Sequence, residues 1–408
     1  MSYASKVRFL DRSTPPHIVT LILLAGLSAL VMNIFLPSLP NMTAHFDTEY
    51  RIMQLSVAVY LGVNAVLQLV IGPISDKMGR RPVILWGLVG FCAATLGCIY
   101  APNIAWFLFF RMAQAMIVTA MVLSRAVVRD CVPQDQAASM IGYVTMGMAV
   151  VPMIGPAFGG VLDQAFGWES NFWLLLLLGA GMYWLTWSDL GETASRSGLT
   201  LGQQFRQYPE LLTSPRFWGY ALAAALASGA FFAYLGGAPF VGTEVFGMSP
   251  AVLGFFFGAP AIGYFLGNFV SGRYSARIGV NRMVFVGSLI NAIGISLSII
   301  IFWLGFGTQW TFFGFMTFVG LGNGMIIPNA TAGMLSVRPH LAGTASGLGG
   351  SIMLGGGAGL SALAGVLLVP GSGPWPLLWI MWITAIGAII AIRFVIWRAD
   401  RLRGLDTA

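Results

Sequence analysis

The chain has 408 residues, of which 57% are hydrophobic and only 9% are charged. Soluble domains carry about 25% charged residues, so this composition excludes an ordinary soluble protein and indicates a membrane protein. The formal net charge of +7 suits anionic lipid head groups, and we expect no nucleic-acid partner.

Long unbroken apolar runs such as NFWLLLLLGAGMYWLTW predict membrane-spanning helices. A helical span needs about 20 apolar residues, whereas barrel strands alternate over about 10. The predicted fold class is therefore an all-α membrane protein. The runs between charged or proline-containing breaks predict twelve transmembrane helices, near residues 17–38, 51–73, 82–100, 104–128, 138–161, 170–188, 216–239, 250–272, 283–304, 309–333, 341–369 and 374–396.

The basic residues test this number of spans. With the N-terminus inside, every Lys and Arg except Arg51 and Arg111 falls in a cytoplasmic segment or at a cytoplasmic helix end. Such an excess of basic residues is typical of cytoplasmic loops, so we expect both termini in the cytoplasm. The first apolar run lacks a small-residue cleavage site, which favours a retained helix over a signal peptide.

The first predicted helix contains the stretch VMNIFLPSLP, in which one amide, Asn33, lies among apolar neighbours. An amide can bind a ligand through its donors and its acceptor, but it cannot titrate. Pro37 and Pro40 predict the outer end of this helix.

A charged turn, GPISDKMGRRPV, follows the second predicted helix. Gly79 permits a tight turn, while Asp76 can cap a neighbouring helix and pair with an Arg. Such a cluster can latch two packed parts of a chain in one state and release them in another. The predicted gating residues are Gly72, Asp76, Gly79, Arg80 and Arg81, with Arg129 and Asp130 at the end of the fourth helix. The alternative is a simple basic cytoplasmic loop.

The fourth predicted helix places Arg111 inside the span, three residues before Gln114. A charge at the bilayer centre costs about 2.5–3.5 kcal/mol on insertion scales, so it usually faces a cavity or a partner. We expect Arg111 to act in coupling or in holding the first helix, the alternative being a purely structural ion pair.

The fifth predicted helix carries small residues at Gly155, Pro156, Gly159 and Gly160. Small residues at these spacings allow two helices to approach closely, and Pro156 is expected to kink the span.

Two halves are predicted on either side of the hydrophilic stretch from 189 to 215. They are a six-helix bundle over 1–188 and a second over 216–408, joined by a cytoplasmic linker. Apolar residues recur at helical spacing within the linker, which predicts a short interfacial helix, with a flexible linker as the alternative. An internal repeat supports the division, because residues 71–87 align without gaps to residues 271–287. Repeated halves characterise one class of secondary transporters, with the substrate site between them.

The turn at 71–87 resembles the signature loop of the major facilitator superfamily, and the matching positions are Gly72, Asp76, Lys77, Gly79, Arg80 and Arg81. Arg111 and Gln114 resemble its helix 4 motif, with Ala115 in place of a glycine. GPAFGG in the fifth helix resembles the motif of its antiporters, with Val151 in place of another glycine. NIFLPSLPNMTAHF and SRAVVRD resemble the Bcr/CflA group of drug:proton antiporters. The resemblance implies a multidrug exporter in the bacterial inner membrane, driven by proton flow.

The chain departs from that group at Asn33, where the group typically has Asp, the carboxylate expected to carry the proton. None of the 14 acidic residues is predicted at the midplane. Two explanations stay open: the protein couples differently or not at all, or Asn33 replaces a natural Asp and imitates its protonated form.

A cavity without negative charge favours small amphipathic substrates that are neutral, zwitterionic or anionic, because Arg111 is its only predicted charge. Adaptable Met and aromatic side chains suit such substrates, although each is as compatible with core packing. The predicted lining residues are Met32, Asn33, Tyr60, Gln68, Met146, Val150, Phe231, Tyr234 and Asn323.

The sequence thus predicts a monomeric proton-linked exporter working by alternating access, with protons, a small molecule and the lipid bilayer as partners. An uncoupled facilitator of the same fold is the alternative, and a membrane sensor is a weaker one. We expect no enzyme, cofactor or metal. Glycine-rich stretches such as GLGNG resemble nucleotide loops, but they lie within predicted spans without a preceding strand.

Overall fold

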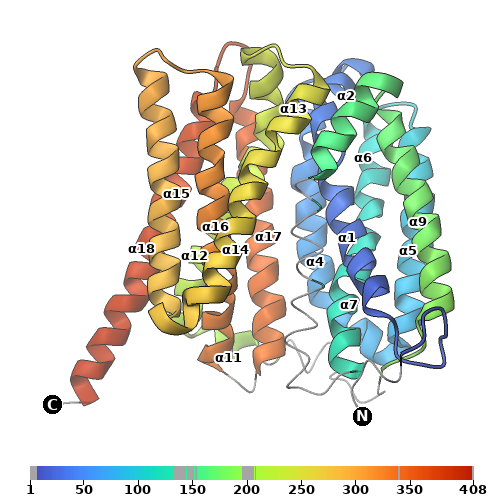
Figure 1. Cartoon of the computed structure of the whole chain (residues 1–408), viewed down its shortest axis with the longest axis horizontal. Helices are drawn as coiled ribbons and strands as arrows, with labels where there is room; N and C mark the ends of the chain where they lie inside the picture. Colours follow the sequence, from blue (N-terminus) through green and yellow to red (C-terminus); the bar gives the residue numbers. More distant parts are fainter. Residues whose placement is uncertain are drawn as a thin grey trace.

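A computed structural model describes residues 7–131, 144, 151, 154–194, 206, 208–338 and 341–406. Within these ranges the regular secondary structure is entirely helical. The helices form two groups that stand side by side, and α1 begins at the same end of the molecule at which α18 ends (Figure 1).

The first group holds the N-terminal helices. Its elements are α1 (Ile18–Asn33), η2 (Leu36–Ser38), α2 (Leu39–His45), α3 (Tyr50–Met53), α4 (Leu55–Met78), α5 (Arg80–Ile99), α6 (Ile104–Ala113), η3 (Gln114–Ile117), α7 (Val118–Cys131), a helix over 154–166 and α9 (Glu169–Asp189).

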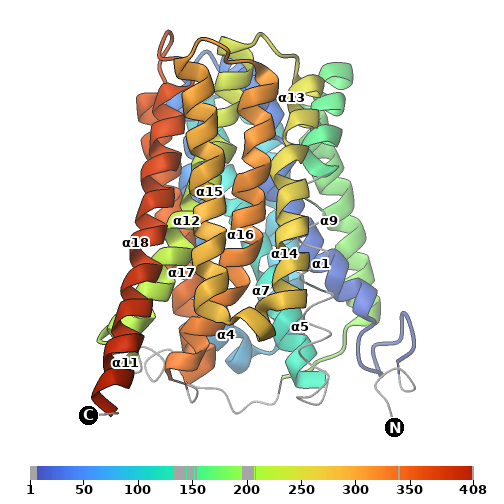
Figure 2. The ribbon, with the colours of Figure 1, turned by 60° about the vertical axis from the view of Figure 1, so that its left-hand side comes forward.

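The second group holds the remaining helices, of which α14, α15 and α16 stand side by side (Figure 2). Its elements are α11 (Tyr208–Leu212), α12 (Pro215–Phe240), the π-helix η4 (Val241–Val245), α13 (Pro250–Phe256), α14 (Gly258–Ile278), α15 (Val280–Trp303), α16 (Gln309–Val337), α17 (Ala342–Leu367) and α18 (Trp375–Asp406).

Ten helical stretches in the described residues are long and apolar enough to cross a membrane. They correspond to the predicted spans 1 to 4 and 7 to 12. The span predicted over 170–188 corresponds to α9. Of the span predicted over 138–161, residues 154–161 belong to a helix over 154–166, and 138–153, except 144 and 151, lie outside the described residues. The predicted all-α membrane fold is thereby confirmed.

The end predicted for the first span was wrong, because after a turn at residues 34–35 the chain continues through η2 and α2 to His45. Pro37 and Pro40 each lie in the first turn of a new helical segment. Proline is tolerated there because its missing N–H would have no partner within the helix. The two prolines therefore divide the helix into segments without ending it.

The linker contains one short described helix, α11, which begins at Tyr208. Leu201 and Phe205, on which the predicted interfacial helix also depended, lie outside the described residues.

The internal repeat appears as two turns with nearly identical backbones. Gly79 joins α4 to α5 with φ of 102° and ψ of 149°, and Gly279 joins α14 to α15 with φ of 91° and ψ of 148°. Residues with side chains rarely adopt a positive φ, which explains why glycine occupies both positions.

Candidate functional site

Arg111 is completely buried in α6, and all its described hydrogen-bond partners are neutral. Its guanidinium donates to the backbone carbonyl oxygens of Val31 at 3.1 Å and Ser56 at 3.3 Å, and to Gln114 Oε1 at 2.7 Å. These bonds connect α6 to α1 and α4. No ion pair of Arg111 occurs in the described part of the chain, so the structural ion pair considered above is not formed there.

Two aromatic rings complete the surroundings of Arg111. Its guanidinium carbon lies 4.1 Å from the centre of the Tyr60 ring and 4.3 Å from that of Phe35. Cation–π contacts of a desolvated Arg contribute about 2 kcal/mol, which offsets part of the cost of burial. The net positive charge remains without a carboxylate among the described contacts.

Asn33 is also buried, with 3% of its surface exposed. Its Nδ2 donates to the carbonyl oxygen of Ala29 at 2.6 Å, whereas its Oδ1 has no hydrogen-bond partner among the described residues. An unsatisfied buried acceptor is costly, so this oxygen is available to a ligand or a proton donor.

Asn33 and Arg111 have different neighbours at the first helix. Arg111 contacts Val31 and Phe35, whereas a side chain added at Gly155 would approach Asn33. No hydrogen bond joins the Asn33 and Arg111 side chains within the described residues. If both residues act in proton coupling, as predicted, the effect of one on the other must pass through α1.

The glycines of the fifth helix make the close contacts for which their spacing is suited. A Cβ at Gly155 would lie 3.1 Å from Leu30, and one at Gly159 would clash with the carbonyl oxygen of Ile34. Gly160 lies against the second group of helices, and a Cβ added there would clash with the carbonyl oxygen of Pro250. Gly254 of α13 is in turn packed against Pro156. This helix therefore lies between α1 and α13.

Hydrogen bonds between described residues join the two groups of helices directly. Tyr50 Oη donates to Gly236 O at 2.7 Å, Gln54 Nε2 to Ser361 O at 2.8 Å, and Ser351 Oγ to Ala65 O at 2.8 Å. The predicted lining residue Gln68 lies beside Gly350 at the same contact between α4 and α17.

The other predicted lining residues have different environments. Tyr234 is buried in an aromatic cluster with Phe231 and Phe257, and its hydroxyl has no hydrogen-bond partner among the described residues. Asn323 accepts a hydrogen bond from Asn291 at 3.3 Å within the second group. Met32 is half-buried. Met146 and Val150 lie outside the described residues.

The predicted gating residues gather around Arg80, the first residue of α5. Its guanidinium forms ion pairs with Asp76 and, at 3.1 Å, with Asp130 of α7. It also donates to the Gly72 carbonyl oxygen at 3.5 Å. The backbone of Arg129 belongs to α7, but its side chain is not among those described.

The first turn of α5 is capped by Glu192, whereas Asp76 forms the predicted pair with an Arg, here Arg80. Glu192 Oε1 accepts a hydrogen bond from the backbone N–H of Arg80 at 2.8 Å. Arg81 donates to the carbonyl oxygens of Leu190 at 2.8 Å and Trp187 at 3.1 Å. The chain after α9 is thus fastened to the turn between α4 and α5.

These contacts stay within the first group of helices, so the described residues show no latch between the two groups at this turn. Cys131 lies beside the cluster, one residue after Asp130. Burial raises the pKa of the Cys131 thiol to about 11, and the Asp130 carboxylate contributes to the increase.

Sequence reasoning missed two acidic residues that fasten helices together. Asp189 is completely buried and accepts hydrogen bonds from Leu10 N, His17 N and Thr20 Oγ1 at 2.7–2.9 Å, which fixes the start of α1. Asp163 accepts one from Asn41 at 2.9 Å. Their placement outside the midplane was predicted, but their partners are distant in sequence and left no local signal.

Comparison with known proteins gives the chain its family. The model of the Major Facilitator Superfamily matches residues 21–362. A bicyclomycin resistance protein homolog of Haemophilus influenzae is 26% identical and covers 97% of this chain and 99% of its own length. Multidrug resistance protein D of Escherichia coli is 28% identical, and the match covers 92% of this chain and 94% of that protein. A chloramphenicol resistance protein of Pseudomonas aeruginosa is 29% identical, and the match covers 86% of this chain and 83% of that protein.

Solved structures agree on the fold. A bacterial homolog of the human lysosomal transporter Spinster, in an inward-facing and occupied conformation, superposes with a TM-score of 0.72 at 17% identity, covering 94% of this chain and 96% of that chain. The human organic anion transporter MFSD10 gives a TM-score of 0.69 at 18% identity, with 93% and 98% covered. The resemblance seen in the sequence motifs is confirmed, and the chain is a multi-pass membrane protein that belongs to the major facilitator superfamily.

Proposed function

We propose that this protein is a secondary exporter of small amphipathic compounds that works by alternating access, and that position 33 is its proton-binding position. Proton antiport then requires Asp at this position, and Asn33 imitates the protonated form of that carboxyl group. In this proposal residues 1–188 and 216–408 are the two moving halves, and 189–215 link them. The protein would act as a monomer in a bacterial inner membrane, with both termini in the cytoplasm. Relatives named for resistance to bicyclomycin, chloramphenicol and multiple drugs support the substrate class.

The observation that carries the proposal is the position of Asn33 at the contact between α1 and the glycine-rich helix. That helix touches α1 through Gly155 and Gly159, and it touches α13 of the other half through Gly160. A change of charge at position 33 would therefore act on a helix that also forms the contact between the halves. The unsatisfied Oδ1 of Asn33 lies where a carboxyl group would take up its proton.

Arg111 supports the selection of substrates without positive charge. Its described partners are carbonyl oxygens, an amide and two rings, so none of these groups is a carboxylate that would neutralise the guanidinium. Organic cations would meet an uncompensated positive charge, whereas neutral, zwitterionic or anionic molecules would not.

An uncoupled facilitator of the same fold is the second candidate. The amide at position 33 favours it, because an amide cannot exchange a proton in the physiological range. In the antiport proposal the same amide imitates the protonated carboxyl group, one of the two states of the cycle.

Transport measurements in proteoliposomes distinguish these candidates. Chloramphenicol would be supplied as the substrate and proton release followed with a pH-sensitive dye, for this chain and for Asn33→Asp. Release by Asn33→Asp alone is the expected result. Equal release by both proteins would exclude position 33 as the proton site, and chloramphenicol transport without release by either would favour the facilitator.

A further inference from the structure

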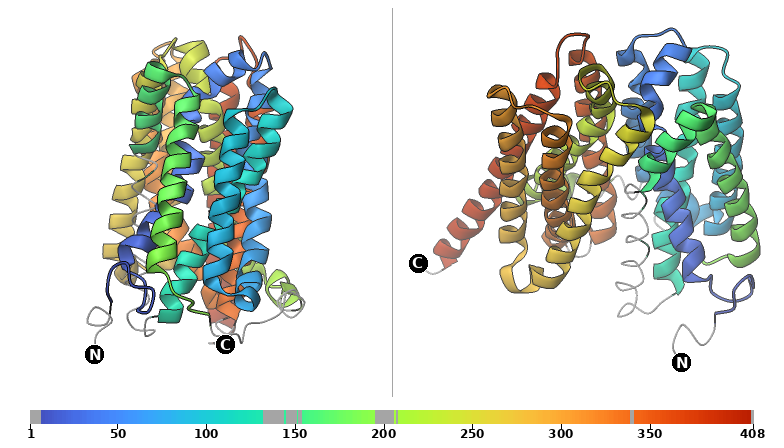
Figure 3. Two further views of the ribbon diagram at one scale, coloured as in Figure 1. Left: turned by 90° about the vertical axis from the view of Figure 1, so that its right-hand side faces the viewer. Right: turned by 45° about the horizontal axis from the view of Figure 1, so that its top comes forward.

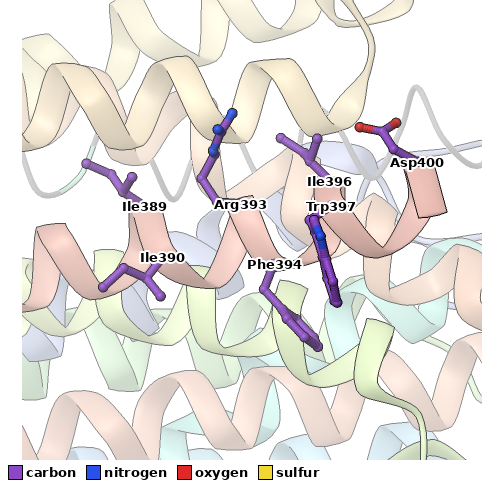
Figure 4. A pocket seen from close by; sticks show the side chains of 7 residues that line it. All are labelled: Ile389, Ile390, Arg393, Phe394, Ile396, Trp397 and Asp400. Carbon is purple, nitrogen blue, oxygen red and sulfur yellow. The ribbon is translucent and has the colours of Figure 1, made fainter.

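A surface groove of about 520 Å³ lies along the C-terminal half of α18 (Figure 4). We call it the α18 groove. Near this end α18 diverges from the other helices (Figure 3, right). The groove is lined by Ile389, Ile390, Arg393, Phe394, Ile396, Trp397 and Asp400.

The depth of the groove follows from the length of the helix. Arg393 lies 18 residues after Trp375, the first residue of α18, which corresponds to about 27 Å along the axis. The hydrocarbon core is about 30 Å thick, so Arg393 lies just inside its far boundary. The long Arg side chain can extend from there to the phosphate groups. Trp397 lies one turn further, where tryptophan is enriched at membrane interfaces. Ile389 and Ile390 precede Arg393 and lie within the hydrocarbon.

Arg393 presents an available positive charge at this level. Its side chain is exposed, and its guanidinium lies 5.4 Å from the ring centre of Phe285 in α15. That contact orients the side chain without neutralising it. No ion pair of Arg393 occurs in the described ranges of the chain.

Asp400 adds a negative charge further out along the same side of the helix. Seven residues separate it from Arg393, which places the two on one face of the helix about 10 Å apart along its axis. Figure 4 shows both side chains pointing to the same side of α18, whereas Phe394 and Trp397 point to the other. Asp400 is exposed and takes part in no ion pair among the side chains that the structure describes.

The order of these groups matches the order of groups in one kind of lipid. From the membrane outward the groove offers apolar side chains, a guanidinium and then a carboxylate. A phospholipid with an ethanolamine head group offers acyl chains, a phosphate and then a primary ammonium group. We propose that the α18 groove binds one molecule of phosphatidylethanolamine, with its phosphate at Arg393 and its ammonium at Asp400.

Other lipids fit the two charges less well. A glycerol head group is neutral, so it offers hydroxyls but no cation to pair with the Asp400 carboxylate. A choline head group has no N–H to donate, so it would lose the hydrogen bond to Asp400. Arg401, whose guanidinium lies 5.2 Å from the Trp397 ring, adds positive charge nearby and would favour any phosphate.

Native mass spectrometry of the full-length protein in detergent micelles tests this site. Phosphatidylethanolamine, phosphatidylcholine and phosphatidylglycerol would be added one at a time, and the bound fraction measured against lipid concentration. The unchanged protein should bind one phosphatidylethanolamine more tightly than the other two lipids. Arg393→Ala should weaken that binding about tenfold, because a charge-assisted hydrogen bond is lost. Asp400→Asn should weaken it about threefold and remove the preference over phosphatidylcholine.

Arg398→Ala serves as the matched control, because Arg398 lies between Arg393 and Asp400 in α18 and does not line the groove. It should leave the binding of phosphatidylethanolamine unchanged. Equal losses in Arg393→Ala and Arg398→Ala would show general charge attraction and overturn the proposal. Tighter binding of phosphatidylglycerol, or a protein dimer without bound lipid, would overturn it as well.

Discussion

The turns at Gly79 and Gly279 have the same backbone but different chemistry. Around Gly79 the contacts are ionic and involve Asp76, Arg80, Asp130 and Glu192. The described side chains around the second turn use neutral hydrogen bonds, such as Asn329 to Ser271 at 2.7 Å and Tyr220 to Asn281 at 2.6 Å. A repeated backbone therefore does not imply repeated side-chain contacts. The ion pairs of Arg80 with Asp76 and Asp130 have no described counterpart at the second turn.

The largest effect should follow from giving the first turn the residue of the second. Arg80→Val introduces the residue found at position 280 and leaves Asp76 and Asp130, which are only about a quarter exposed, without their partner. Breaking such a pair costs about 3 kcal/mol. Thermal unfolding in detergent should show a clear loss of stability, together with reduced transport. Arg277→Ala, at an exposed position of the second turn, should change stability by less than about 0.5 kcal/mol.

The two glycines should differ in their tolerance of a side chain. Gly79→Ala and Gly279→Ala both force a positive φ, which costs about 1–3 kcal/mol. Only at Gly79 would the new Cβ also clash with Glu192, because nothing among the described residues lies within 4 Å of the corresponding position at Gly279. Unfolding midpoints should therefore fall further for Gly79→Ala. Equal midpoints would mean that the Glu192 side chain moves aside at no cost.

A smaller effect is expected at Glu192, whose carboxylate caps the first turn of α5. Glu192→Ala removes this cap and should cost about 1 kcal/mol in the same unfolding assay. Glu192→Gln keeps an acceptor oxygen and should retain most of the stability. A neutral result for Glu192→Ala would show that the linker contacts of Arg81 suffice.

The smallest effect concerns Cys131, which reports on the first turn without contributing to it. Because the pKa of its thiol is raised to about 11, the thiol stays protonated at neutral pH and should react slowly with maleimide. Labelling should accelerate as the pH rises towards that pKa. In Arg80→Val it should accelerate already at neutral pH, because a loosened cluster admits water. Fast labelling of the unchanged protein would contradict the described packing.

The sequence predicted the spans and the two repeated turns because apolar runs, basic loops and glycine spacing are local patterns. It predicted the wrong end for the first helix, since prolines in the first turn of a helix resemble prolines that end one. It also missed the Glu192 cap, which joins residues 112 positions apart. Asn33 and Arg111 were both predicted, but their separate partners, the fifth helix for Asn33 and the Val31 carbonyl oxygen for Arg111, depend on packing between helices.

Substrate-driven proton release tests the central proposal most directly when both halves are compared. Asn33→Asp and Asn323→Asp each place a carboxyl group at a buried amide, the first near the contact between the halves and the second beside Asn291 inside the second half. We expect chloramphenicol-driven proton release in proteoliposomes for Asn33→Asp and none above background for Asn323→Asp. Equal release by the two variants, or release by Asn323→Asp alone, would contradict the assignment of position 33 as the proton site.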